Sequence, residues 1–533
     1  MNSIGIALLA LALESASPQT GPWRAWLVSP GGELPFGLEI ARGDQGLRVA
    51  IVNGSERIQV PSIRTQGEEM FFELSHFDSL LRVRFSVDGA SAVGKWTKRS
   101  GADRWTTLTF GARAGAAPRF PALGDPEAAA ANAGAIDGRW KVAFDPSGDP
   151  AIALFRTVDD GSIEGTFLTP TGDYRYLAGT LDGDRLRLSA FDGAHAYLFD
   201  ARLTEKGELA GDFYSGDRWH EQWKAKRDDR AELPDAYSLT RWNDAFGLDA
   251  LAYPDLEGEL RSLGGPEFAG RALVVQLFGT WCPNCHDEMA YLAELHRRYE
   301  PRGLSIVGLA FEYTSDAERS VAQVRRALTR HGAQYPVLIA GLADKHQASE
   351  AFPAIDRLRA FPTTIFIGRD GRVRGVHTGF SGPGTGAAYV ELKAEFEARI
   401  EELLTSPPPP STASKPQSRE EAVLRAADRV IAARQATGNL PTPLDAAAAL
   451  TDADVLVRCA AARACGERKL EATWSSLGGC LSHGFAPLRR EAAVALGKLG
   501  VKASAEFLQA CARDLDPAVR AAALQALQAI EGR

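Results

Sequence analysis

The sequence predicts a multidomain chain that combines a duplicated all-β barrel or sandwich module, an α/β domain and a C-terminal α-solenoid. Three observations support this fold class. Period-two alternation with glycine turns fills the N-terminal part, buried strands alternate with helical spacing in the middle, and a 31-residue repeat occupies the C-terminal part. A chain of 533 residues is also too long for a single hydrophobic core. We therefore expect several separately folded domains.

Net charge excludes one class of partner. The formal charge is −8 and the isoelectric point is near 5.7. The chain therefore has no excess of Lys and Arg with which to follow a phosphate backbone or an anionic membrane. We expect no nucleic-acid partner.

The N-terminus carries an apolar run, Ile4 to Leu13, that is too short to cross a bilayer but has the length of a signal-peptide core. We interpret residues 1–17 as a signal peptide, although no Lys or Arg precedes the run. The mature protein would then be extracytoplasmic, periplasmic or secreted, and soluble. A cytoplasmic N-terminus is the alternative. No later apolar run reaches about 20 residues, so we expect no membrane span in the mature chain.

Two β modules are predicted over residues 22–118 and 137–226. The run LRVRF at 81–85 alternates apolar and charged residues, and Gly-containing pairs such as Asn53-Gly54 supply the turns. Each copy offers about eight strands. We expect the repeated aromatic residues to form the core, with a ligand-stacking surface as the alternative. The second copy repeats positions of the first at offsets of 114 to 117 residues: Trp23 and Trp140, Phe77 and Phe191, Gly94 and Gly211, Trp105 and Trp219.

Residues 236–404 form the predicted α/β domain. Ala272 to Phe278 and Leu304 to Phe311 are continuous apolar runs typical of buried parallel strands. The residues that follow Cys285 have helical spacing, and a hairpin turns at Asp370-Gly371. Residues 405–418, TSPPPPSTASKPQS, follow as a semi-rigid linker, because proline removes backbone donors and fixes φ.

Residues 419–533 contain a repeat of period 31, which aligns Arg458, Arg489 and Arg520. Repeats of this length, each an antiparallel helix pair, predict an α-solenoid. The motif resembles short HEAT repeats. Four cysteines lie in this region. In repeat register, Cys480 matches Cys511 and Ala449, and Cys465 matches Leu496 and Leu527, so these positions favour small or apolar side chains. We therefore expect them to be packing residues and not metal ligands: Cys459, Cys465, Cys480 and Cys511.

The remaining two cysteines form the motif CPNCH at 282–286, which fits two kinds of chemistry. A c-type haem attaches through C-x-x-C-H, and a thioredoxin-like dithiol uses C-x-x-C. The haem interpretation would use His286 as a ligand and a distal Met or His, but neither Met70 nor Met289 is well placed. The motif also leaves a buried strand directly and enters a helix. This context favours the dithiol.

A strand-to-helix turn is the place that dithiol chemistry needs. The unpaired N–H groups and the positive end of the helix dipole stabilise a thiolate at the first cysteine. Cys282 should therefore be the exposed nucleophile, and Cys285, one turn further, should attack the mixed disulfide and release the partner. Pro283 suits an early helical position, because its missing N–H would have been unpaired there.

The stretches LVVQLFGTWCPNCHDEM, GLSIVGLAFE, YPVL and AFPTTIFIGRDGRV resemble the thioredoxin-like family of TlpA and ResA type, which are extracytoplasmic thiol-disulfide oxidoreductases. The resemblance covers about a third of the chain. It implies a cis peptide at Phe361-Pro362 that faces the cysteines and pairs with substrate, and a partner surface shaped by Trp281. It also implies disulfide-containing protein substrates, no cofactor or metal, a membrane electron donor and the reductase direction.

The sequence offers two candidates for the acid that would exchange a proton with Cys285. Thioredoxins have a buried acid six residues before the nucleophile, where this chain has Gln276. The family's alternative acid falls on Glu312, which we expect to be the acid-base partner of Cys285. Glu288 matches another acid of the family, with a helix-dipole role as the alternative. His286 is expected to be an exposed helix residue.

The sequence thus predicts a thiol-disulfide oxidoreductase whose catalytic domain lies between interaction modules. A redox-inactive scaffold with a thioredoxin-like binding domain remains the main alternative, and a c-type cytochrome is disfavoured. A peroxidase of the peroxiredoxin kind is also disfavoured, because the P-x-x-x-T-x-x-C loop is absent from the sequence.

Overall fold

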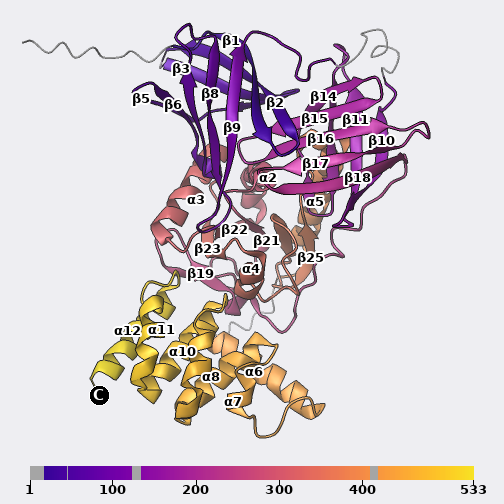
Figure 1. Cartoon of the computed structure of the whole chain (residues 1–533). Helices are drawn as coiled ribbons and strands as arrows, with labels where there is room; N and C mark the ends of the chain where they lie inside the picture. The colour runs from indigo at the N-terminus through magenta and orange to yellow at the C-terminus, as the bar shows by residue number, and fades with distance from the viewer. Residues whose placement is uncertain (1–16, 45, 123–133, 409–417, 533) are drawn as a thin grey trace, which may run out of the picture. The chain divides into compact units, whose positions relative to one another are not determined.

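A computed structural model describes residues 17–44, 46–122, 134–408 and 418–532. The predicted signal peptide lies outside these ranges except for its last residue, as does most of the predicted linker. The chain divides into two compact units. One comprises residues 1–168 and 174–232, and the other comprises residues 169–173 and 233–533. The N-terminal unit is built from strands, and the C-terminal unit contains the α/β domain and the helical repeats (Figure 1).

The first β module is one antiparallel sheet of nine strands in the order β4-β3-β2-β1-β9-β8-β7-β6-β5. Strand β7 shows why the alternating pattern folds this way, since Leu81 and Val83 are buried while Arg82 and Arg84 are exposed. The strands are β1 Gly21–Ser29, β2 Gly32–Gly43, β3 Gly46–Asn53, β4 Glu56–Gln59, β5 Ser62–Gln66, β6 Glu69–Leu74, β7 Ser79–Phe85, β8 Ser91–Arg99 and β9 Trp105–Ala114.

The second β module also has nine strands, in the order β11-β10-β18-β17-β16-β15-β14-β12-β13. Because β11 pairs with β12 as well as with β10, this sheet closes on itself. Its strands are β10 Gly138–Asp145, β11 Pro150–Thr157, β12 Ile163–Thr169, β13 Gly172–Asp173, β14 Leu177–Asp182, β15 Arg185–Phe191, β16 Ala196–Leu203, β17 Leu209–Ser215 and β18 Trp219–Arg227.

The two modules share a strand order in which the first strand lies between the second and the last. Two glycines that match in sequence also match in structure. A Cβ atom at Gly94 would lie 1.9 Å from the Arg82 carbonyl oxygen, and one at Gly211 would lie 2.0 Å from that of Asp200. Each strand therefore approaches its neighbour at a position where only glycine fits. The equivalent contacts agree with a duplicated module.

The repeated aromatic residues do not all lie in the core. Trp23 and Trp140 are buried as expected, but Trp105 and Trp219 are 46% and 56% exposed. Both are the first residue of the last strand of their module, where the side chain stands at the rim of a hairpin. The alternating pattern predicts which face a residue occupies, but it does not tell how far the sheet extends to cover that face.

The α/β domain is a five-stranded sheet in the order β23-β22-β21-β24-β25. Strands β21, β22 and β23 are parallel, and β24 and β25 form the predicted antiparallel hairpin. All seven residues of β21 are buried, as the apolar run predicts. A short hairpin, β19 Ala252–Pro254 and β20 Leu260–Ser262, precedes the sheet, whose strands are β21 Ala272–Phe278, β22 Leu304–Glu312, β23 Val337–Leu342, β24 Thr363–Ile367 and β25 Val373–Thr378.

Four helices complete this domain. Helix α2 follows β21 directly and begins at Pro283, and α3 begins after Asp316, whose side chain accepts the Arg319 N–H and caps the helix. The helices are α2 Pro283–Tyr299, α3 Ala317–His331, α4 Lys345–Ala351 and α5 Ala387–Thr405.

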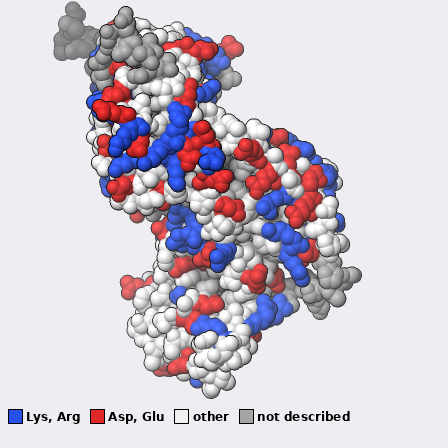
Figure 2. Space-filling view, turned by 90° about the vertical axis from the view of Figure 1, so that its right-hand side faces the viewer, with Lys and Arg blue, Asp and Glu red and all other residues white. Residues whose placement is uncertain are grey.

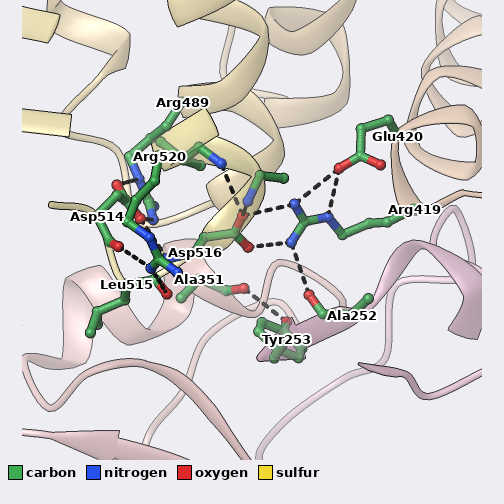
Figure 3. Close-up of polar contacts among 12 residues, drawn as sticks. Ala252, Tyr253, Ala351, Arg419, Glu420, Arg489, Asp514, Leu515, Asp516 and Arg520 are labelled. Atoms are coloured by element: carbon green, nitrogen blue, oxygen red, sulfur yellow. Dashed lines mark hydrogen bonds and ion pairs between the residues drawn. The ribbon is translucent and has the colours of Figure 1, made fainter. Parts of the chain in front are cut away.

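The C-terminal helices stack in antiparallel order, as the repeat predicts (Figure 1). Two of the three repeated arginines, Arg489 and Arg520, bind the loop before their own helix. Arg489 donates to the carbonyl oxygens of His483 and Gly484, and Arg520 donates at the same spacing to those of Asp514 and Leu515 (Figure 3). The helices are α6 Arg419–Ala436, α7 Ala446–Ala449, α8 Val455–Glu467, α9 Trp474–Cys480, α10 Ala486–Leu499, α11 Ala505–Cys511 and α12 Pro517–Glu531.

Three further observations concern the cysteines, the surface charges and the length of the helices. The four cysteines of the helical repeats are all buried, in agreement with a packing role. Basic and acidic side chains are intermingled on the face drawn in Figure 2. Within the described ranges, no helix combines the length and apolar character required to cross a membrane.

Candidate active site

The two cysteines lie where the central strand passes into the first long helix of the α/β domain. Cys282 is the N-cap of α2, and Pro283 occupies its first turn. The Cys282 Sγ accepts the backbone N–H of Cys285 at 3.4 Å. The sulfur therefore takes up one of the unpaired N–H groups at the positive end of the helix dipole. This is the arrangement that stabilises a thiolate.

Cys282 is more enclosed than the sequence suggested. We expected an exposed nucleophile, but its side chain is buried and the residue is 7% exposed, while Cys285 is 0% exposed. On one side, the Cys282 thiol donates to the Phe361 carbonyl oxygen at 3.4 Å. The expectation was wrong because it rested on the helix start alone, whereas segments distant in sequence cover the sulfur.

Cys285 is the more deeply buried of the two thiols, and its burial affects its pKa. Burial raises the pKa of Cys285 well above its usual value, and the hydrogen bond and charge of Cys282 raise it further. Cys285 therefore stays protonated until a base removes its proton. A thiol that stays protonated is what a resolving cysteine requires, since it should react only after the mixed disulfide has formed.

Glu288 lies one turn beyond Cys285 on α2 and is fully buried. Its carboxylate accepts hydrogen bonds from the Gln276 amide, at 2.7 Å, and from the Thr364 hydroxyl. Burial raises the pKa of Glu288 to about 7, and its charge contributes to the raised pKa of Cys285. A carboxyl group with this pKa exchanges protons near neutral pH.

Glu312, the acid that the sequence favoured, is also buried, at the end of β22. Its Oε1 accepts the backbone N–H of Thr280 at 2.9 Å, and its Oε2 accepts the Thr280 hydroxyl at 2.8 Å. These bonds fix the loop that leads into Trp281 and Cys282. A proton-transfer role for Glu312 stays a prediction, and Glu288 is the carboxyl group whose charge bears on Cys285.

The residues expected to meet a substrate lie beside the dithiol. The Phe361-Pro362 peptide is cis, as the resemblance implies. The Trp281 indole N–H donates to the Phe311 carbonyl oxygen at 3.0 Å, and its ring meets Phe361 edge-on at 5.5 Å between centroids. Trp281 also stacks on Tyr313, with 5.0 Å between centroids. Trp281, Phe361 and Tyr313 thus form an aromatic cluster next to Cys282.

His286 is not the exposed residue that the sequence suggested. It is 6% exposed, its Nε2 lies 2.7 Å from the Thr280 carbonyl oxygen, and its Nδ1 lies 2.7 Å from Nε2 of His331. Because a carbonyl only accepts, Nε2 of His286 carries the proton, and Nδ1 accepts from His331 when both rings are neutral. Burial lowers the pKa of His331 to about 4, which agrees with a neutral ring. Both ring nitrogens of His286 are engaged, which argues against the haem interpretation.

Nothing in the local sequence signals this histidine pair. His331 ends helix α3, 45 residues beyond His286, and the helical pattern at that point indicates only a solvated helix end. Gln276 was also given no role, yet its amide binds both the Cys285 carbonyl oxygen, at 3.3 Å, and Glu288. Its position on an otherwise apolar buried strand was the available signal.

Comparison with known proteins supports the same two parts of the chain. Residues 242–391 match the Redoxin family, and residues 418–529 match HEAT repeats. Thiol-disulfide oxidoreductase ResA of Halalkalibacterium halodurans is 31% identical over 127 residues, which cover 24% of this chain and 62% of that protein. Thioredoxin-like protein YneN of Bacillus subtilis is 27% identical over 124 residues, covering 23% and 65%.

Among solved structures, a thiol:disulfide interchange protein of the thioredoxin family from Chlorobium tepidum TLS is 25% identical, with a TM-score of 0.22, and covers 29% of this chain and 92% of that chain. The chain spans about three fifths of the length of the curated relatives that it matches. The family matches confirm the resemblance of the α/β domain to thioredoxin-like oxidoreductases and of the C-terminal helices to HEAT repeats.

Proposed function

We propose that this protein is a thiol-disulfide oxidoreductase that reduces disulfides in partner proteins. One observation carries the proposal. Cys282 caps the helix that holds Cys285, so its sulfur accepts a backbone N–H at the helix start, and the Cys285 thiol, whose pKa is raised, lies one turn away. The match to proteins titled thiol-disulfide oxidoreductase supports the same activity.

The reaction takes two exchange steps. The Cys282 thiolate attacks one sulfur of the partner disulfide, and a mixed disulfide forms as the partner's other sulfur leaves as a thiolate. Cys285 then loses its proton and attacks the Cys282 sulfur, which releases the second partner thiolate. The Cys282-Cys285 dithiol is oxidised to a disulfide, the partner disulfide is reduced to two thiols, and the protons of the two cysteines balance those taken up by the partner.

Glu288 is the group we assign to the proton of Cys285. Its carboxylate accepts that proton when the second step begins, because burial raises the pKa of Glu288 to about 7 and its charge acts on Cys285. Glu312 has the role of holding Thr280, and with it the backbone that leads into Cys282. The proposal thus moves the acid-base role from Glu312 to Glu288.

The remaining modules recruit the partners. We place the protein outside the cytoplasm, with a membrane-bound donor that reduces the Cys282-Cys285 disulfide after each cycle, because the predicted signal peptide and the resemblance to the TlpA and ResA type imply both. No cofactor takes part in the proposed exchange. The β modules and the helical repeats are proposed as interaction surfaces.

Reduction of insulin disulfides by the full chain in the presence of dithiothreitol tests this function. The proposal predicts faster precipitation of the insulin chains than dithiothreitol produces alone. The scaffold alternative predicts the same rate with and without the protein.

A pH-dependent stability difference is expected from Glu288. Its folded-state pKa of about 7 lies above the usual glutamate value, so the folded protein binds this proton more tightly than the unfolded chain. The stability that it contributes is fully present below about pH 4.5 and is lost as the pH rises to about 7, a change of about 3 kcal/mol. This change in unfolding free energy is measured by urea unfolding of the full chain at several pH values, with hydrogen exchange of β21 and α2 as the probe of the α/β domain.

The matched comparison is Glu288→Gln, which keeps the shape and one of the two accepting oxygens but does not titrate. The difference in unfolding free energy between wild type and Glu288→Gln should shift in favour of the variant as pH rises from about 4.5 to 7. A difference that is independent of pH over this range would show that Glu288 is ionised normally. Glu288→Gln should also slow insulin reduction more than Glu312→Gln at neutral pH.

A further inference from the structure

The residue between the two cysteines is held by a segment far away in the sequence. Residues 169–173 group with the unit that contains the α/β domain. The Asn284 amide Nδ2 donates to the Asp173 backbone oxygen at 3.4 Å and to the Asp173 carboxylate at 3.3 Å, and it also lies 3.2 Å from the Phe380 carbonyl oxygen. Asn284 is 6% exposed and Asp173 is 5% exposed. These bonds are therefore shielded from water.

The same carboxylate oxygen of Asp173 joins a second segment beside the dithiol. Oδ2 accepts the backbone N–H of Gly382 at 2.5 Å as well as the Asn284 amide. Asp173 therefore connects the first turn of α2 with the chain that follows β25. A charged acceptor that receives two buried N–H donors makes stronger hydrogen bonds than a neutral one.

Backbone packing brings this segment against the cis peptide region. Gly379 has φ +82°, and a Cβ atom there would lie 2.8 Å from the Thr171 carbonyl carbon. Its N–H donates to the Pro362 carbonyl oxygen at 2.9 Å. Gly172 has φ +143°, and a Cβ atom there would lie 2.6 Å from the Asn284 amide nitrogen. Both glycines allow an approach that a side chain would prevent.

Residues 169–173 thus contact the chain on two sides of Cys282. One contact is with Asn284 on helix α2, and the other is with Gly379, which is hydrogen-bonded to Pro362. Disulfide exchange requires a partner sulfur to reach the Cys282 Sγ, and access to the attacking sulfur limits the rate. Cys282 is only 7% exposed, and this segment binds Asn284, two residues from the attacking sulfur.

We propose that residues 169–173 determine which disulfides reach Cys282, and that Asp173 is the positioning residue that holds them in place. This rests on the proposed exchange at Cys282. The segment admits small disulfides and disulfides in flexible or unfolded chains, and it excludes disulfides on a rigid folded surface. The selection acts through access and not through the chemistry of the sulfur.

Alkylation of Cys282 by reagents of different size tests the proposal in the full chain. Reduced protein is treated with iodoacetamide or with a maleimide joined to a long polyethylene glycol, and the rate at Cys282 is read by peptide mass spectrometry. In Asp173→Ala the bulky reagent should react about tenfold faster than in wild type, which corresponds to loss of the two hydrogen bonds of Oδ2. The rate with iodoacetamide should stay close to that of wild type.

Three variants keep the test decisive. Asp173→Asn keeps an oxygen that accepts both bonds but loses the charge, so its rate with the bulky reagent should lie between those of wild type and Asp173→Ala. Gly172→Ala should act as Asp173→Ala does, because its Cβ displaces the segment from Asn284, and it covers the case in which Asp173→Ala folds poorly. Asp160→Ala removes an exposed turn carboxylate and should change neither rate.

An equal effect on both reagents, or no effect of Asp173→Ala and Gly172→Ala while Cys282 reacts, would overturn the proposal. Failure of the proposed enzymatic function would give a different result, namely no insulin reduction by the wild type. The alkylation test is independent of that result, because it measures access to Cys282 without any disulfide substrate.

Discussion

Cys282→Ser is expected to reduce insulin disulfides at least about a thousandfold more slowly than wild type, because a serine hydroxyl does not ionise near neutral pH and cannot replace the attacking thiolate. The fold should survive the change. Serine is a preferred N-cap residue, so its hydroxyl takes over the hydrogen bond from the Cys285 N–H. Loss of activity in a folded variant would therefore report on the sulfur itself.

A cysteine of the helical repeats provides the control for this variant. Cys480 is buried in α9 and matches Ala449 in the repeat register, so Cys480→Ala removes a thiol without opening a large cavity. It should leave insulin reduction unchanged. Activity of Cys282→Ser equal to that of wild type would remove the enzyme proposal and favour a thioredoxin-like domain that only binds.

The second large effect is expected at Arg419, the first residue of the helical repeats. Its side chain is 3% exposed and forms a double ion pair with Asp516, at 2.5 and 3.1 Å (Figure 3). It also donates to the Ala252 carbonyl oxygen at 3.1 Å, in strand β19. Asp516 in turn caps α12. One guanidinium group therefore joins the first and last helices of the repeats with the hairpin of the α/β domain.

Arg419→Met should lower the free energy of opening of α6 and α12 by about 3–5 kcal/mol, because it leaves the Asp516 carboxylate buried and unpaired. Native-state hydrogen exchange of these helices in the full chain measures the loss. Adding Asp516→Asn removes the buried charge but keeps the cap, so the double variant should recover part of the stability.

An exposed pair of the same composition is the matched control. Arg425 lies 3.4 Å from Asp249, and both side chains are nearly half exposed. Arg425→Ala should cost less than about 1 kcal/mol, because water screens an exposed pair. If Arg419→Met and Arg425→Ala lower the free energy of opening equally, the buried pair stabilises the helices no more than the exposed pair does.

Local patterns predicted the elements that build the site. The run ALVVQLF is apolar throughout and is bounded by Arg271 and Gly279, and strand β21 has the same limits as the run. Pro283 after Cys282 indicated the start of α2, because proline suits the first helical turn. These features depend on neighbours within a few residues, which the sequence displays directly.

The features that the sequence did not predict depend on contacts over long separations. Asp173 and Asn284 are 111 residues apart, and no periodicity or turn signal links them. The burial of Cys282 and of His286 likewise comes from segments that a helix pattern does not contain. The proposed preference for Glu288 over Glu312 also needed coordinates: both are buried, but the Glu288 charge acts on Cys285 whereas Glu312 accepts hydrogen bonds from Thr280.

The central claim is that Cys282 and Cys285 form a reversible dithiol pair that donates electrons to other disulfides. Equilibration of the full chain with glutathione buffers of known potential, followed by mass spectrometry of the peptide that contains both cysteines, tests it most directly. We expect a two-electron couple with a reduction potential of about −270 mV, the value of thioredoxin. A potential of about −120 mV would contradict the reductase direction, and a pair that forms no disulfide at any buffer ratio would contradict the claim itself.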